Sequence, residues 1–263
     1  MTVDGVSLPF DDAGAGAAVV FVHGHPFDRS MWRPQLAHLA ATGRRGVAPD
    51  LRGYGDATVV PGVTTLDVFA RDVVALMDHL ELRDAVLVGL SMGGQIVLEL
   101  YRLAPERVAG LVLADTSARA ETPAGRAHRN DTADRLLRDG MAPYAHEMLP
   151  RMVAPQHVAA RSGVAEHVLG MMLATSPDGA AAALRGRAER PDYVALLERV
   201  TVPALVVVGD RDELTPLAEA RLMHERVTGS RLAVIEGAGH LPNLERPDAF
   251  DAALDAFLDD HFA

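Results

Sequence analysis

The sequence predicts an α/β fold, a doubly wound and mostly parallel sheet with a small helical cap inserted into it. Two observations predict this class. Short apolar runs that end at Gly or Asp alternate with amphipathic stretches, which is typical of a parallel sheet covered by helices on both faces. One long segment breaks the alternation and carries helical patterns only, as an insertion between two strands would.

Six short apolar runs, most of them rich in β-branched residues, are expected to be strands. They occupy residues 19–22, 46–48, 85–88, 111–113, 205–208 and 232–235. Amphipathic stretches at 66–80 and 96–103 lie between several of these runs and are expected to be helices.

Residues 117–199 form the segment that breaks the alternation. It is rich in Ala, Leu, Met and Arg and is punctuated by prolines, which predicts several short helices. The expected organisation is therefore a core made of residues 1–116 and 200–263, with residues 117–199 as a helical cap. The cap holds half of the chain's methionines, for which gap filling between helices is favoured over lining a substrate pocket. They are Met141, Met148, Met152, Met171 and Met172.

The composition excludes several classes of protein. The chain has 263 residues, 49% hydrophobic and 23% charged, with a formal net charge of -11. Neither nucleic acid nor an anionic membrane is expected as a partner, because both require clustered positive charge. Without cysteine, disulfides, thiolate catalysis and cysteine-ligated metals are ruled out. No signal-like segment or transmembrane run is found, so the expected location is cytoplasmic.

The motif that points to chemistry is Gly-Leu-Ser-Met-Gly at 89–93, directly after the run at 85–88. A serine in a tight strand-to-helix turn needs small residues two positions away on each side, because its strained backbone would otherwise clash with the strand and helix. Gly89 and Gly93 meet this need and would leave the Ser91 hydroxyl exposed above the carboxyl edge of the sheet. Ser91 as a plain helix N-cap is the alternative.

A serine nucleophile requires a base, and the base requires an orienting carboxylate. The run at 205–208 ends in a loop that contains Asp210 and Asp212, and the run at 232–235 ends in a glycine-rich loop that contains His240. Both loops leave the carboxyl ends of their strands, where an open α/β sheet binds its ligand. The remaining histidines have no comparable context, and no pair of them suggests a metal site.

Five motifs in this order resemble those of the α/β-hydrolase-fold serine hydrolases across nearly the whole chain. They are His-Gly-x-Pro at 23–26, Asp-x-x-Gly-x-Gly at 50–55, the serine turn at 89–93, Gly-Asp-x-Asp at 209–212 and Gly-x-Gly-His at 237–240. The pattern is similar to the carboxylesterase, enol-lactonase and cofactor-free perhydrolase subgroups, so the resemblance implies no cofactor.

The resemblance also implies an oxyanion hole made of two backbone amides. One comes from the residue after His-Gly, which is His25, and the other from the residue after the nucleophile, which is Met92. His23 is expected to brace the turn. The His25 side chain is interpreted as part of the pocket wall, because its amide already explains the placement of the loop.

The family pattern Gly-x-x-Asp selects Asp212 as the acid of the triad and leaves Asp210 to brace its loop. Asp115, after the run at 111–113, is a more distant candidate. Serine at position 91 argues against haloalkane dehalogenase and epoxide hydrolase relatives, which carry an aspartate there.

The resulting hypothesis is a serine hydrolase that cleaves a carboxylic ester or lactone through an acyl-enzyme on Ser91, with Asp212 and His240 completing the triad. A 3-oxoadipate enol-lactonase-like or perhydrolase activity is an alternative on the same residues, and a non-catalytic small-ligand receptor is the alternative from another class. The expected partner is a small-molecule ester or lactone, and a homo-oligomer is compatible with the sequence. Three arginines near the start of the cap would suit an acidic substrate, but a solvated helix face is favoured. They are Arg119, Arg126 and Arg129.

Overall fold

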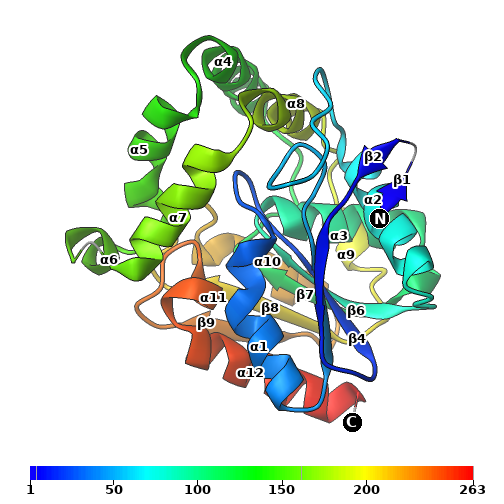
Figure 1. Ribbon diagram of the computed structural model, residues 1–263. Helices are drawn as coiled ribbons and strands as arrows, with labels where there is room; N and C mark the ends of the chain where they lie inside the picture. The colour runs from blue at the N-terminus through cyan, green and yellow to red at the C-terminus, as the bar shows by residue number, and fades with distance from the viewer. Residues whose placement is uncertain (4, 161, 263) are drawn as a thin grey trace.

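A seven-stranded sheet forms the centre of the computed structural model, which describes residues 1–3, 5–160 and 162–262 (Figure 1). The strand order is β3-β5-β4-β6-β7-β8-β9, and every neighbouring pair is parallel except β3 with β5. The strands are β3 (Phe10–Ala13), β4 (Ala18–Val22), β5 (Arg45–Pro49), β6 (Ala85–Leu90), β7 (Val108–Ala114), β8 (Ala204–Gly209) and β9 (Arg231–Ile235). A separate ribbon pairs β1 (Thr2–Val3) with β2 (Val6–Ser7).

The predicted fold class is confirmed, and all six expected strands lie within observed ones. The edge strand β3 was not predicted, because its Phe-Asp-Asp-Ala sequence has neither an apolar run nor a clear alternation. Its two aspartates sit at the antiparallel edge of the sheet, where Asp12 pairs with Arg45 of β5 through hydrogen bonds of 2.9 and 2.7 Å. Charged edge strands of this kind are common because they discourage pairing with other chains.

Helices cover both faces of the sheet, and alternate residues of the central strands face opposite layers. Val86 and Val88 of β6 pack on the side of α1 (Arg33–Ala41) and α12 (Pro247–Phe262). Leu87 packs on the opposite side. That side holds α2 (Leu66–His79), α3 (Met92–Leu103), α9 (Val194–Leu197) and α10 (Leu217–Arg226). Within the described ranges, no helix combines the length and the apolar character needed to cross a membrane.

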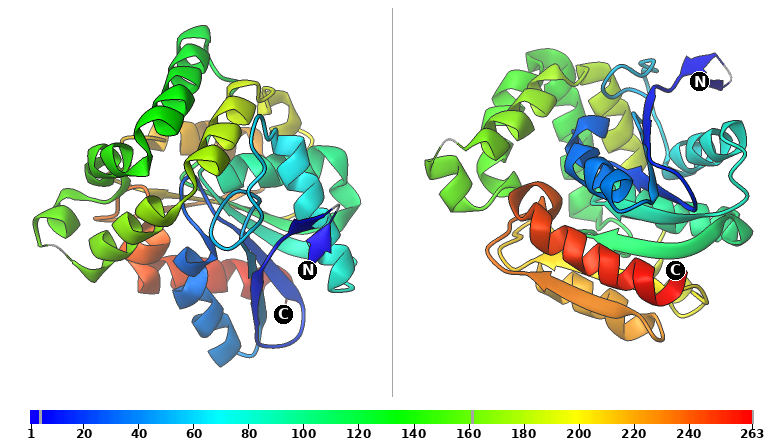
Figure 2. Two further views of the ribbon diagram at one scale, coloured as in Figure 1. Left: turned by 45° about the horizontal axis from the view of Figure 1, so that its top comes forward. Right: turned by 60° about the horizontal axis from the view of Figure 1, so that its bottom comes forward.

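The segment between β7 and β8 contains helices and, in its described residues, no strand. Its helices are α4 (Pro123–Asp139), α5 (Met141–Met152), α6 (Pro155–Ala159), α7 (Gly163–Ala174), α8 (Pro177–Ala188) and α9. Local signals explain several of the helix starts: the side chains of Thr122, Ser162 and Ser176 each accept a hydrogen bond from a backbone N–H in the first turn. Helices α4, α5, α7 and α8 stand over one edge of the sheet (Figures 1 and 2).

Candidate active site

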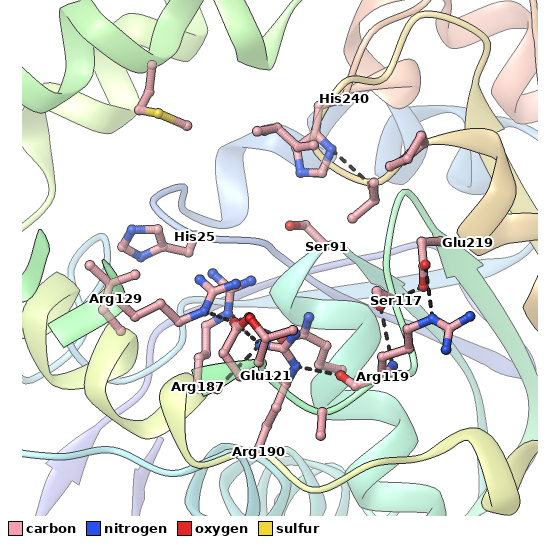
Figure 3. Close-up of a pocket in the computed structure, with 18 of the residues that line it drawn as sticks. His25, Ser91, Ser117, Arg119, Glu121, Arg129, Arg187, Arg190, Glu219 and His240 are labelled. Atoms are coloured by element: carbon pink, nitrogen blue, oxygen red, sulfur yellow. Dashed lines mark hydrogen bonds and ion pairs between the residues drawn. The ribbon is translucent and has the colours of Figure 1, made fainter. Parts of the chain in front are cut away.

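Ser91 follows β6 directly and has a strained backbone, with φ of 56° and ψ of -114°. The two flanking glycines make this turn possible. A β-carbon on Gly89 would overlap the backbone of Gly93, and one on Gly93 would overlap the carbonyl oxygen of Val22. Although Ser91 occupies the N-cap position of α3, its side chain makes no capping hydrogen bond. Its hydroxyl instead points into a cavity (Figure 3).

His240 and Asp212 meet above the same sheet edge. His240 Nδ1 lies 2.8 Å from Asp212 Oδ2, so its other ring nitrogen is left for the cavity that His240 lines. Asp212 Oδ1 accepts the amide of Leu214 at 2.8 Å, and Oδ2 accepts the Thr215 hydroxyl. Burial alone would raise the pKa of Asp212, but His240 and these hydrogen bonds hold it below its usual value. Asp212 is therefore an ionised partner for the imidazole.

Two further aspartates lie near this pair. Asp210 Oδ1 accepts the amide of Gly237 at 2.7 Å and so joins the loops after β8 and β9, as expected of a bracing residue. Asp115 Oδ1 accepts the amide of Gly209 at 2.9 Å, and its Oδ2 is buried without a partner. Burial and then the nearby Asp212 raise the pKa of Asp115 well above its ordinary value. Burial and the neighbouring Asp212 therefore favour the neutral form of Asp115.

Asp115, Asp212 and His240 also place ligand atoms within 4.8 Å of one another. Two carboxylates and an imidazole form a donor set that suits a divalent cation. Here, however, Asp212 and His240 bond to each other, and both oxygens of Asp212 accept further hydrogen bonds. The cluster is held together by hydrogen bonds, which fits an acid–base pair.

The turn at 23–26 lies directly against the serine turn. A β-carbon on Gly24 would lie 3.0 Å from the Leu90 carbonyl oxygen and 3.2 Å from Ser91 Cβ, so glycine makes this close approach possible without displacing its neighbours. His23 braces the turn as expected: its Nε2 accepts the amide of Leu51 at 3.0 Å, and its Nδ1 lies 2.9 Å from the carbonyl oxygen of Gly24. Met92, the first residue of α3, is fully buried beside them.

His25 lines the cavity and is almost completely buried. Its Nδ1 lies 2.8 Å from the Tyr54 hydroxyl, and its Nε2 has no hydrogen-bond partner. Burial, followed by the charges of Arg187 and Arg129, lowers the pKa of His25 well below its usual value. The imidazole is therefore neutral.

The cavity has a volume of about 420 Å³ and lies between the sheet edge and the helical segment. The five methionines of that segment divide between the two interpretations given above. Met148 and Met152 line the cavity. Met141, Met171 and Met172 are buried in the hydrophobic core and do not line it. The prediction that these methionines fill gaps between helices is thus correct for Met141, Met171 and Met172, whereas Met148 and Met152 also line the cavity.

The prediction of a solvated helix face is correct for Arg126, which is exposed and pairs with Glu189 at 2.5 Å. It is wrong for Arg129, which lines the cavity and donates to Glu121. Arg119 is half-exposed, also lines the cavity and pairs with Glu219 at 3.1 Å. The reason for the error is that Arg129 lies on the face of α4 that meets Glu121.

Several polar residues of the site were not predicted from the sequence. Arg187 and Arg190, at the end of α8 and just after it, join Arg129 in the cavity wall (Figure 3). No motif marks them, because the face that a short helix turns inward depends on its packing. Glu121 and Gln95 complete this part of the wall.

Glu245 was missed as well, although it holds the His240 loop in place. Its Oε1 accepts the amides of Gly239 at 2.9 Å and Leu241 at 3.2 Å, on either side of His240. Its Oε2 accepts the amide of Ala154 at 2.7 Å. A single buried carboxylate therefore connects the loop after β9 to the helical segment.

The fold and the site together define a hydrolase-like enzyme with a serine at a strand-to-helix turn. The family model described as the alpha/beta hydrolase family matches residues 19–253, so the chain belongs to this family. It is 29% identical to 3-oxoadipate enol-lactonase 2 of Acinetobacter baylyi over 98% of this chain and 95% of that protein. The protein is thus a carboxylic ester hydrolase of the esterase and lactonase group.

Two solved structures support this assignment. A thermophilic esterase from Thermogutta terrifontis, described as malate bound, has a TM-score of 0.96 and 39% sequence identity, covering 100% of this chain and 97% of that one. The enol-lactonase from Burkholderia xenovorans LB400 has a TM-score of 0.90 and 28% identity, covering 98% of each chain.

Proposed function

We propose that the protein hydrolyses a carboxylic ester or lactone by two-step acyl transfer, with Ser91 as nucleophile, His240 as base and Asp212 as orienting acid. The observation that carries the proposal is the Ser91 hydroxyl in the cavity, on a strained turn and facing the same space as the His240–Asp212 pair. A serine used only as a cap would bond to its helix, and Ser91 does not.

In the first step His240 Nε2 takes the proton of the Ser91 hydroxyl as the oxygen attacks the substrate carbonyl. The backbone amides of His25 and Met92 stabilise the negative charge on the carbonyl oxygen. His240 then gives its proton to the leaving alkoxide, which departs as an alcohol. In the second step water attacks the acyl-enzyme with His240 again as base, and the acid is released.

A lactone follows the same course, except that the leaving hydroxyl stays attached to the acyl group after the ring opens. The similarity to two enol-lactonases supports lactones as substrates beside open-chain esters.

The test is a comparison of the wild type with Ser91→Ala. We expect a fluorophosphonate to label Ser91 in the wild type only. Hydrolysis of a 4-nitrophenyl ester should fall by about 10⁴-fold or more in the variant. Equal turnover by the two proteins would remove the mechanism. Binding without turnover by the wild type would favour a receptor.

A further inference from the structure

One wall of the cavity collects more positive charge than its acidic residues balance. Arg129, Arg187 and Arg190 all line it. Glu121 is the carboxylate among them: its Oε2 accepts Arg190 Nη1 at 2.6 Å and also the Nε of Arg129. We call these four residues the arginine cluster. Three guanidinium groups against one carboxylate leave an excess of two positive charges.

Arg187 is the member whose charge is least compensated. The guanidinium is buried, and the hydrogen bond that the structure gives it runs from Nε to the neutral Gln95 Oε1 at 3.2 Å. Within the described residues, the side chain donates no other hydrogen bond and forms no ion pair, and Arg187 lines the cavity. Burial, and then Arg129 and Arg190, lower the pKa of Arg187 well below its ordinary value. A buried cation without a counter-ion is costly, so this position favours an incoming anion.

The other groups near Arg187 do not supply that anion. Burial raises the pKa of both Tyr54 and Tyr144, so their hydroxyls stay neutral, and His25 is neutral as well. Arg119 does not alter the balance, because it pairs with Glu219. The chain as a whole carries a net charge of -11. The positive wall is therefore a local feature that opposes the average charge of the molecule.

The position of the cluster relative to the reacting groups decides which end of a substrate it meets. Figure 3 shows Arg129 and Arg187 below the level of Ser91 and His25, whereas His240 lies above Ser91. The leaving group has to lie beside His240, because His240 protonates it. A group held by the arginine cluster consequently belongs to the acid portion of the substrate.

We propose that the arginine cluster binds a carboxylate in the acid portion of the substrate, so that the enzyme hydrolyses esters or lactones of dicarboxylic acids. This inference rests on the function proposed above. Guanidinium groups suit the role because their parallel N–H donors match the two oxygens of a carboxylate. Such an anchor would also hold the carbonyl of the substrate against Ser91, which favours reaction.

The test compares two esters whose acyl chains have the same length. 4-Nitrophenyl hydrogen glutarate ends in a carboxylate and 4-nitrophenyl pentanoate ends in a methyl group. We expect the wild type to prefer the glutarate. Arg187→Met should lower kcat/KM for the glutarate by about 10- to 100-fold more than it lowers kcat/KM for the pentanoate. The matched control is Arg185→Met on the same helix, where Arg185 pairs with Asp134 outside the cavity and should affect neither ester.

The proposal would be overturned if the wild type hydrolysed the two esters with equal kcat/KM and Arg187→Met gave the same ratio of the two kcat/KM values. Folding is checked by thermal unfolding: Arg187→Met should unfold at the same or a higher temperature, because it loses an uncompensated buried cation. A large drop in that temperature would make Arg187 a structural residue and contradict its assignment here.

Binding to Ser91→Ala separates this proposal from the hydrolytic mechanism. Calorimetry should detect glutarate binding to Ser91→Ala and lose it in the Ser91→Ala/Arg187→Met double variant, whether or not the esters are turned over. Equal binding of inorganic phosphate would contradict the choice of a carboxylate, and no binding of glutarate would contradict the cluster as an anion site.

Discussion

The two walls of the cavity differ in how they are built. Ser91, Asp212 and His240 come from loops that directly follow the parallel strands β6, β8 and β9, so the sheet fixes where they meet. The arginine cluster comes from α4, α8 and the segments beside them, where packing between helices decides which side chains face inward. The first wall is expected to carry the reaction and the second to choose the substrate.

The largest effect on kcat is expected for Asp212→Asn, in the wall that carries the reacting residues. The variant loses the charge that orients His240, and kcat should fall by about 10³- to 10⁴-fold, as in the serine-protease example. Asp210→Asn is the matched control, because Asp210 braces the same loop through Gly237 and does not touch His240. Kinetics with one 4-nitrophenyl ester measure both. A larger loss of kcat in Asp210→Asn than in Asp212→Asn would show that Asp210, and not Asp212, is the acid that orients His240.

A smaller effect is expected at Glu245, which joins the loop after β9 to the helical segment. In Glu245→Gln an amide group replaces one carboxylate oxygen, so at least one of the N–H groups of Ala154, Gly239 and Leu241 loses its acceptor. Because His240 lies between two of these residues, we expect kcat to fall by about 10- to 100-fold with little change in KM. The free energy of unfolding should fall by about 1–3 kcal/mol.

The exposed Glu236→Gln is the control for this variant, since it changes the charge of the same loop without a buried contact. Steady-state kinetics and urea unfolding give the two quantities. If Glu245→Gln lost stability while kcat stayed the same, Glu245 would only support the fold.

Methionine variants distinguish the positions that line the cavity from those buried in the core of the helical segment. Met148→Ala and Met152→Ala enlarge the cavity, so each should shift the preference among acyl chain lengths by about 1–3 kcal/mol at most. Met141→Ala and Met172→Ala instead leave a cavity in the hydrophobic core, and each should lower the free energy of unfolding by about 2–5 kcal/mol. Measuring kcat/KM over a series of esters, with unfolding of all four variants, checks this division. The division would be wrong if only Met141→Ala and Met172→Ala changed the preference among acyl chain lengths.

The last effect concerns stability alone and is expected for Asp115→Asn, which tests the buried carboxyl group beside Asp212. The pKa of Asp115 is raised in the folded protein, so its contribution to stability is complete below the unfolded pKa of about 3.9 and is lost as the pH rises. Asparagine keeps an oxygen for the Gly209 amide but does not ionise. The variant should therefore gain Tm relative to the wild type between pH 4 and pH 8. A Tm difference that stays constant over this range would contradict a raised pKa.

The sheet wall could be predicted from the sequence and the helical wall could not. Gly89 lies near the end of β6, Gly93 in the first turn of α3 and His240 in the loop after β9. The order of the strands therefore decides where these residues lie. Arg187 lies in the last turn of α8, and its direction depends on how α8 packs on α4. Glu245 was missed for another reason: it acts through backbone amides, which leave no pattern in the sequence.

The geometry of the serine turn has a consequence for how this scaffold accepts change. The positive φ at position 91 strains small side chains without a branch at Cβ to a similar degree, so another nucleophile of this kind would meet nearly the same backbone energy as serine. Gly89 and Gly93 allow no such exchange, because any β-carbon there overlaps the backbone. The turn can therefore accept a different nucleophile at residue 91, but it cannot accept a side chain at residue 89 or 93.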